Sequence, residues 1–343
     1  MPWRLGTVDL GILAEVTPVV WKDELLLFES VQTVYYGNMN GSAPGETGYL
    51  RFVHVFSGQH SAPFGRGFQL GCAKVVGGAM HVFATYAPQR ITSNNSFVSH
   101  FTSTDLVTWT EEKVLDFATI PASHFPSGWK RMVWNTSVDK GQLRGKEVWV
   151  MAFEWSDPTP RVGWNTLFAT AQSIDGPWEV LRGAGLPRDV SHANPTLRFY
   201  DDWWYVWTNR DTCGSQASPL DLSEIYRSRD LVAWEGPPGW SATSCPTSVL
   251  TPRQAEDARV VPAPWHPDTR PVVAKHAAEL QNASDINNSD MDLVEYRNQT
   301  VLYYSWGDQQ LGLTAMVLAV AEVDMAPGDW ARSFFRQPSL PSA

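Results

Sequence analysis

Five stretches of the chain alternate between apolar and polar residues on both sides of a short polar turn, the pattern of an antiparallel β-hairpin. Side chains on one face of a strand recur at every second position, so the alternation predicts strands that bury one face. Turns of Lys-Asp, Gly-Gly, Lys-Gly, Asp-Asp and Arg-Asn divide the stretches. The predicted first strands begin near Thr17, Gly71, Asn135, Asn194 and Asp290. The chain is therefore predicted to be all-β.

The hairpins recur at a regular interval. The first four starts lie roughly 60 residues apart, which fits a four-stranded propeller blade with its loops, and the fifth follows after roughly 100. Five hairpins predict a five-bladed β-propeller that occupies residues 1–343 as a single domain. The longer interval predicts an insertion in blade four, about 237–284, with short helices at "TPRQAEDARVV" and "AKHAAELQNAS". We expect this insertion to lie over or beside the ligand site and to limit substrate length.

A second repeat lies between the hairpins. A Ser-x-Asp turn followed by a tryptophan occurs in "STDLVTW" from Ser103, "SIDGPW" from Ser173 and "SRDLVAW" from Ser228. An aspartate at a turn accepts hydrogen bonds from its own backbone, and the tryptophan can fill the space between neighbouring blades. We interpret this motif as structural and exclude its aspartates, Asp105, Asp175 and Asp230, from the catalytic candidates.

Composition narrows the possible partners. Of the 343 residues 43% are hydrophobic and 18% are charged, which suits a large core, and no apolar run reaches the roughly 18 residues of a membrane span. The formal net charge of −10 would repel a phosphate backbone. We therefore predict neither a membrane nor a nucleic acid as partner. The 17 tryptophans indicate large aromatic faces, used as core plugs or as platforms for a flat ligand.

The cysteines and the first residues bear on the compartment. Cys72, Cys213 and Cys245 have no CxxC spacing, which argues against a disulfide framework or a zinc ribbon and leaves a Cys213–Cys245 pair or buried thiols. The segment "MPWRLGTVDLGILAEV" has no basic region followed by an apolar one. We expect a cytoplasmic protein, or a secreted one if a leader was removed.

The hairpin openings "TP", "NTSV" and "NP", with the outer Ser-x-Asp-Leu-x-x-Trp strands, resemble the five-bladed β-propeller glycosidases around glycoside hydrolase families 43, 32 and 117. The resemblance covers nearly the whole chain at the level of the blade pattern. It implies that the first strands line a central channel and that the ligand funnel lies where they begin. Family 43 has an Asp before the first-strand proline and a Glu-Gly-Pro acid. Here the corresponding segments read "AEVTPVV", with Glu15 near Thr17, and "SHANPTL", with His192 and no glutamate.

Antiparallel pairing returns the end of each second strand to the face where the first strand begins. The predicted funnel therefore gathers carboxylates, amides and aromatic rings. Such groups suit a sugar, because its apolar face stacks on rings while its hydroxyls bond planar polar partners. The predicted substrate-binding residues are Glu29, Trp134, Asn135, Glu154, Trp155, Asn194, Arg210 and Trp306.

Glycoside hydrolysis needs one protonated and one ionised carboxyl group, roughly 6.5–9.5 Å apart in an inverting enzyme. The leading pair is Glu15 with Asp290, at the openings of adjacent blades. Asp292 lies two residues further on, where it would shift the pKa of its neighbour. His192 is the candidate acid in place of the missing glutamate, acting as an imidazolium. The same histidine also suits a calcium or sodium ligand in the channel, or a buried core position.

The sequence thus predicts a glycoside hydrolase, exo-acting and inverting, that releases a terminal sugar from an oligosaccharide. We expect no required cofactor, and a calcium or sodium ion in the channel would be structural. The sequence determines neither the sugar nor the oligomeric state. Two alternatives stay open: a non-catalytic propeller that binds glycan, and a glycoside phosphorylase in which Arg131 and Arg210 would hold phosphate.

Overall fold

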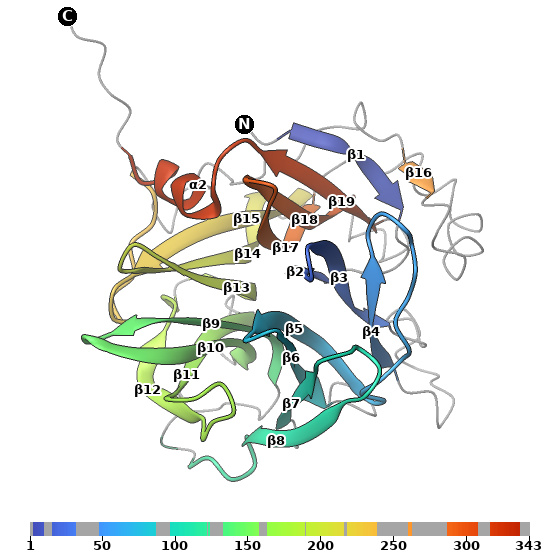
Figure 1. The fold of residues 1–343 in the computed structure, drawn as a ribbon. Helices are drawn as coiled ribbons and strands as arrows, with labels where there is room; N and C mark the ends of the chain where they lie inside the picture. Colours follow the sequence, from blue (N-terminus) through green and yellow to red (C-terminus); the bar gives the residue numbers. More distant parts are fainter. Residues whose placement is uncertain are drawn as a thin grey trace, which may run out of the picture.

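The chain folds into largely antiparallel β-sheets arranged around a common centre (Figure 1). The structure is a computed structural model. It describes residues 3–9, 16–31, 48–86, 97–121, 123, 133–157, 163–188, 190–215, 218–238, 260–262, 287–307 and 316–336. Among these residues the α-helix is α2 (Pro327–Ser333). No helix in this described part of the chain is long and apolar enough to cross a membrane.

Five hairpins form the sheets' inner parts, and they are the five that the alternation predicts. They pair β2 (Val16–Trp21) with β3 (Glu24–Val31), β5 (Phe68–Val76) with β6 (Ala79–Tyr86), β9 (Val133–Leu143) with β10 (Lys146–Asp157), β13 (Ala193–Tyr200) with β14 (Trp203–Ser215), and β17 (Asn287–Tyr296) with β18 (Gln299–Gly307).

Two-residue turns with positive φ at both positions close the hairpins, as strand twist favours. Four are the predicted turns Lys22-Asp23, Gly77-Gly78, Asp201-Asp202 and Arg297-Asn298. The third prediction, Lys140-Gly141, is wrong, because the turn lies at Arg144-Gly145. Gly141 lies within β9, where an added Cβ would come within 2.3 Å of the Phe199 ring. That glycine permits close packing of β9 and does not make a turn.

Further strands extend the hairpins. β4 (Tyr49–His54) pairs with β3, β7 (Phe97–Ser103) and β8 (Thr110–Asp116) follow β6, β11 (Gly163–Ala171) and β12 (Glu179–Gly185) follow β10, and β15 (Ser218–Ser228) pairs with β14. β19 (Met316–Val323) pairs with β18, and the early strand β1 (Trp3–Asp9) pairs antiparallel with β19. Two parallel residue pairs between β15 and β17 join the last two groups into one eight-stranded sheet.

Of the predicted insertion, 237–284, the structure describes the first two residues and one further segment. This segment is β16 (Val260–Pro262), which pairs parallel with β1 at the edge of the eight-stranded sheet. The helical pattern "TPRQAEDARVV" is therefore wrong at its end, where two β-branched valines enter a strand. The segment is separated from the first strand β17 by three strands of that sheet. The rest of the insertion lies outside the described residues, as does its predicted position over the ligand site.

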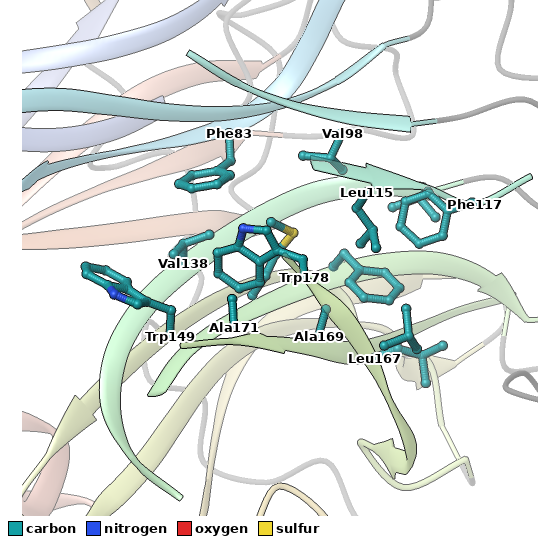
Figure 2. Close-up of a cluster of buried hydrophobic side chains, with 14 of the residues drawn as sticks. Phe83, Val98, Leu115, Phe117, Val138, Trp149, Leu167, Ala169, Ala171 and Trp178 are labelled. Carbon is teal, nitrogen blue, oxygen red and sulfur yellow. The ribbon is translucent and has the colours of Figure 1, made fainter. Parts of the chain in front are cut away.

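The tryptophans of the Ser-x-Asp repeat fill the spaces between sheets, as the sequence predicts. Trp178 meets Phe83 edge to face with ring centroids 5.6 Å apart, within the core between β5–β8 and β9–β12 (Figure 2). The Trp109 ring stacks on the Phe64 ring with centroids 3.9 Å apart. The Trp234 ring stacks on Phe168, which belongs to the preceding sheet. Aromatic area buried in this way holds neighbouring sheets together.

Cys72 is a free thiol that lies in the same core as Trp178 and Phe83. Burial, followed by the charge of Asp292, raises the pKa of this thiol to about 12, so it stays protonated at neutral pH. The side chains of Cys213 and Cys245 lie outside the described residues.

Candidate functional site

A cavity of about 40 Å³ lies where the first strands of the five hairpins come together. Each first strand contributes residues from near its start, as the sequence predicts. The lining residues are Val16, Thr17, Gly71, Asn135, Thr136, Ser137, Asn194, Pro195, Thr196, Asp290, Met291 and Asp292.

Four of these strands carry a β-bulge beside the cavity, where the pairing between first and second strand shifts. One residue of positive φ lies at each bulge: Leu70, Asn135, Asn194 and Asp290. Asn and Asp occupy this left-handed region more readily than other residues with a side chain. The bulges therefore favour amide and carboxylate side chains at the cavity.

Glu154, on the second strand β10, joins two of the bulges. Its Oε2 accepts hydrogen bonds from Asn135 Nδ2 at 3.1 Å and from the backbone N–H of Asn194 at 2.6 Å. Asn135 Nδ2 also donates to Asn194 Oδ1. Hydrogen bonds to an ionised group are stronger than those between neutral groups. Glu154, which is buried, thus orients two of the predicted binding residues.

Asp290 is held by a reciprocal pair of hydrogen bonds. Asn209 Nδ2 donates to Asp290 Oδ1 at 3.0 Å, and the Asp290 backbone N–H donates to Asn209 Oδ1 at 3.2 Å. Asn209 is not among the predicted site residues, although it lies at the end of a predicted second strand, next to Arg210. The two residues link β14 to β17 and fix the carboxylate at the cavity.

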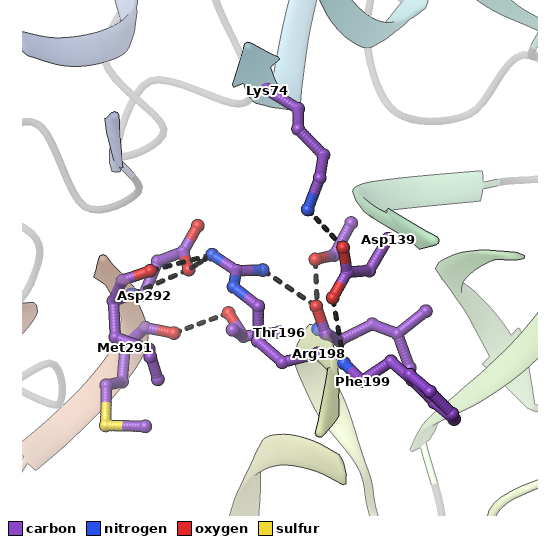
Figure 3. A network of polar contacts seen from close by, with 10 residues as sticks. Lys74, Asp139, Thr196, Arg198, Phe199, Met291 and Asp292 are labelled. Carbon is purple, nitrogen blue, oxygen red and sulfur yellow. Dashed lines mark hydrogen bonds and ion pairs between the residues drawn. The ribbon is translucent and has the colours of Figure 1, made fainter. Parts of the chain in front are cut away.

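Asp292 also lines the cavity, but an ion pair engages its carboxylate. Arg198 Nη2 donates to Asp292 Oδ1 and, at 2.9 Å, to the carbonyl of Leu293 (Figure 3). Burial raises the pKa of Asp292, and the charge of Arg198 opposes that shift. On the other side of Arg198, Lys74 donates to Asp139, so polar contacts cross from β5 through β9 and β13 to β17. We interpret this network as structural and call it the clamp, because it holds these four strands together.

His192 is fully buried, and the described part of the chain offers neither ring nitrogen a well-formed hydrogen bond. Its ring meets Tyr226 edge to face at 5.1 Å. Burial, then the nearby charge of Arg210, lowers the pKa of His192 to about 3. The ring is therefore neutral at pH 7 and does not fit the predicted role of an imidazolium acid. It is also absent from the cavity lining.

Two predicted binding residues lie in buried ion pairs. Glu29 Oε2 accepts from Arg51 Nε at 2.7 Å, and both side chains are almost fully buried. Arg210 Nη1 donates to Glu224 Oε1 at 3.2 Å, and the Tyr226 hydroxyl donates to the other Glu224 oxygen at 2.5 Å. Such pairs hold strands together, and the phosphate role considered for Arg210 finds no support in this arrangement.

Two of the three predicted aromatic platforms, Trp134 and Trp155, are buried. Trp155 is fully buried within the core between two sheets, so its prediction as a sugar platform is wrong. Trp134 is 5% exposed and meets Trp164 edge to face at 6.1 Å. Glu15 and Arg131 lie outside the described residues, and so does the side chain of Trp306. Asn135, Asn194, Asp290 and Asp292 are the predicted site residues that the structure brings to one cavity.

No protein-family model matches the sequence, and no curated protein matches it. Solved structures do match along most of the chain. A family 93 α-L-arabinofuranosidase of Fusarium graminearum, with arabinobiose, has a TM-score of 0.56 at 10% identity over 94% of this chain and 98% of its own. A family 43 β-xylosidase/α-arabinofuranosidase from a compost metagenome, with xylotriose, has a TM-score of 0.51 at 11% identity over 94% and 95%.

The fold is that of the propeller glycoside hydrolases. An exo-1,5-α-L-arabinanase from a bovine ruminal metagenomic library extends the likeness, with a TM-score of 0.52 at 8% identity over 90% of this chain and 92% of its own. Similar chain paths at such low identity leave the chemistry to be argued from the residues.

Proposed function

We propose that the protein is a glycoside hydrolase, that its fold is a five-bladed β-propeller, and that its substrate binds where the first strands begin. The observation that carries the proposal is the convergence of Asn135, Asn194 and Asp290 on one cavity, each from the bulge of a different first strand. Irregular backbone positions of this kind cluster at functional sites, where they aim particular side chains. The likeness to glycoside hydrolases supports the same class.

The similar structures support a proposal for the substrate class. Their names refer to arabinofuranosides, xylosides and arabinan, and two of them hold arabinobiose or xylotriose. We extend this to exo-action on a terminal pentose of a short arabino- or xylo-oligosaccharide. Asn135 and Asn194 offer amide groups to sugar hydroxyls, and Glu154 keeps them in position.

Asp290 is the proposed ionised carboxylate. The amide of Asn209 donates to one of its oxygens, which suits a group that works in its charged form. A cavity of about 40 Å³ has room for water and not for a sugar ring. The sugar would therefore bind at the mouth, with a water below it next to Asp290, which is the arrangement of an inverting mechanism. Glu15 remains the proposed partner on the strength of the sequence alone, since it lies outside the described residues.

The experiment is a screen of aryl α-L-arabinofuranosides and β-xylosides together with arabinobiose and xylotriose, with and without phosphate. The anomer of the first product is read by NMR. We expect hydrolysis that is independent of phosphate and gives the inverted anomer. Saturable binding without turnover would instead identify a glycan-binding propeller, and phosphate-dependent turnover would identify a phosphorylase.

A further inference from the structure

Two buried histidines and an aspartate meet between the β5–β8 and β9–β12 sheets. His81 on β6 and His100 on β7 lie diagonally on one face, because His100 pairs with Phe83 two positions from His81. His81 Nδ1 and His100 Nε2 are 2.8 Å apart. Asp175, from the "SIDGPW" turn of the neighbouring sheet, places Oδ1 3.6 Å from His100 Nδ1. Each residue offers one ligand atom, and these atoms lie within 4.8 Å of one another.

Asp175 differs from its counterparts in the Ser-x-Asp repeat. Asp105 and Asp230 each accept two backbone N–H groups, from the residues two and three positions further on. In "SIDGPW" the first of those positions is Pro177, which has no N–H to donate. The carboxylate of Asp175 contacts Ser173 at 3.5 Å and faces His100. A local change in the repeat has thus directed this carboxylate toward the histidines.

The arrangement of the two rings and the carboxylate suits a cation. His81 Nδ1 lies opposite His100 Nε2, and the Asp175 carboxylate lies 3.6 Å from His100 Nδ1. One N–H between two neutral rings satisfies the 2.8 Å contact without a metal, and a metal ion that accepts a lone pair from each ring is the alternative. The Thr102 hydroxyl, 3.3 Å from His100 Nε2, can donate to that nitrogen but cannot join the two rings. With the metal bound, the Asp175 carboxylate would turn from His100 Nδ1 to the ion as its third ligand.

We propose that His81, His100 and Asp175 bind a divalent transition-metal ion, and that zinc is the ion they fit. Imidazole nitrogens with a carboxylate suit zinc, whereas calcium and magnesium prefer all-oxygen sites. Tetrahedral zinc with bonds of about 2.0–2.2 Å needs ligand atoms about 3.3 Å apart. The rings must part slightly, and the Asp175 side chain, 65% exposed, must move inward. Three protein ligands leave a fourth position for water on the solvent side.

The site is separate from the first-strand cavity, because none of the three residues lines that cavity. Its inner side is closely packed: the Phe83 ring stacks on His100 with centroids 4.4 Å apart, and Trp178 packs against Phe83. The ion would link β6 and β7 to the turn of the adjacent sheet. A ligand that binds only the folded chain stabilises it, by an amount that grows with the logarithm of the ligand concentration above Kd. This ion would therefore hold the two sheets together.

The test is a titration of the chelator-treated full chain with zinc, and separately with calcium, followed by calorimetry and thermal unfolding. We expect one zinc ion per chain bound at these residues, a Tm that rises with zinc concentration, and no response to calcium. His81→Gln should abolish this binding, and Asp175→Asn should weaken it at least about tenfold. Asp105→Asn is the matched control, in an equivalent turn without histidines, and should bind as the wild type does.

Asp175 is exposed, so the Asp175→Asn variant keeps the test valid even if changes at the buried His81 impair folding. The proposal is overturned if the wild type binds no zinc, or if zinc affinity is the same in Asp175→Asn as in the wild type. Glycosidase activity does not enter the measurement, so its outcome is independent of the proposed function.

Discussion

The backbone N–H of Asn194 donates a 2.6 Å hydrogen bond to Glu154 Oε2, so the second strand of one sheet holds the first strand of the next. Asn135 Nδ2 donates to the same oxygen. Both donors lie at bulges, where the ladder of strand pairing is interrupted. The cavity amides therefore depend on one buried carboxylate for their position.

Glu154→Ala is expected to lower the free energy of unfolding by about 1–3 kcal/mol, because it leaves the partly buried N–H of Asn194 without this acceptor. It should also lower kcat/KM on a confirmed substrate, since both asparagines lose their anchor. Urea denaturation and steady-state kinetics measure the two effects. Glu147→Ala, an exposed glutamate on the same strand, is the control and should change stability by less than about 0.5 kcal/mol. Unchanged stability in Glu154→Ala would contradict the anchoring role.

Asp290→Asn should reduce turnover by about 10²–10⁴-fold, the usual contribution of a general acid or base. Asparagine also tolerates the left-handed backbone of residue 290 and can keep the contacts with Asn209, so Tm should stay nearly unchanged. Asp202→Asn, another left-handed aspartate but in a hairpin turn, is the control and should keep full activity. Full activity of Asp290→Asn would remove this residue from the mechanism and turn attention to Glu15, Glu154 and Asp292.

Asp292→Ala should destabilise the fold by about 3–5 kcal/mol, because it leaves the Arg198 charge buried without its partner. The double variant Arg198→Met/Asp292→Leu should regain part of that loss, since no buried charge remains. Asp329→Ala, which breaks the exposed pair with Arg332, is the control and should cost under about 1 kcal/mol. Urea midpoints compare the variants, and equal effects at the two pairs would show that Asp292 is not part of a clamp.

His192 should make stability depend on pH. Its pKa is about 3 in the folded chain and about 6.5 when unfolded, so between these values the unfolded chain binds more protons. Stability is therefore complete above about pH 6.5 and falls as pH drops toward 3, by at most about 1.4 kcal/mol per unit from this group. His192→Phe should flatten the slope between pH 6.5 and 4, measured by urea denaturation at each pH. An unchanged slope would show that His192 is not buried in its neutral form.

Local sequence determined the hairpins. Alternation sets which face of a strand is buried, and the turns Lys22-Asp23 and Asp201-Asp202 consist of residues that tolerate positive φ, so both signals act within a few residues. The predicted openings placed Asn135, Asn194 and Asp290 correctly for the same reason, because a residue at the start of a first strand faces the centre in each repeat.

Tertiary structure decided what each side chain does there. Gly141 reads as a turn residue until the Phe199 ring of the next sheet occupies the space that a Cβ would need. Trp155 and His192 are residue types that suit a sugar site, but neighbouring sheets bury them. Arg198 and Asp292 are 94 residues apart in sequence, and no local pattern pairs them. Periodicity determines which way a side chain points, whereas burial and charge pairing depend on contacts between sheets that only the assembled fold brings together.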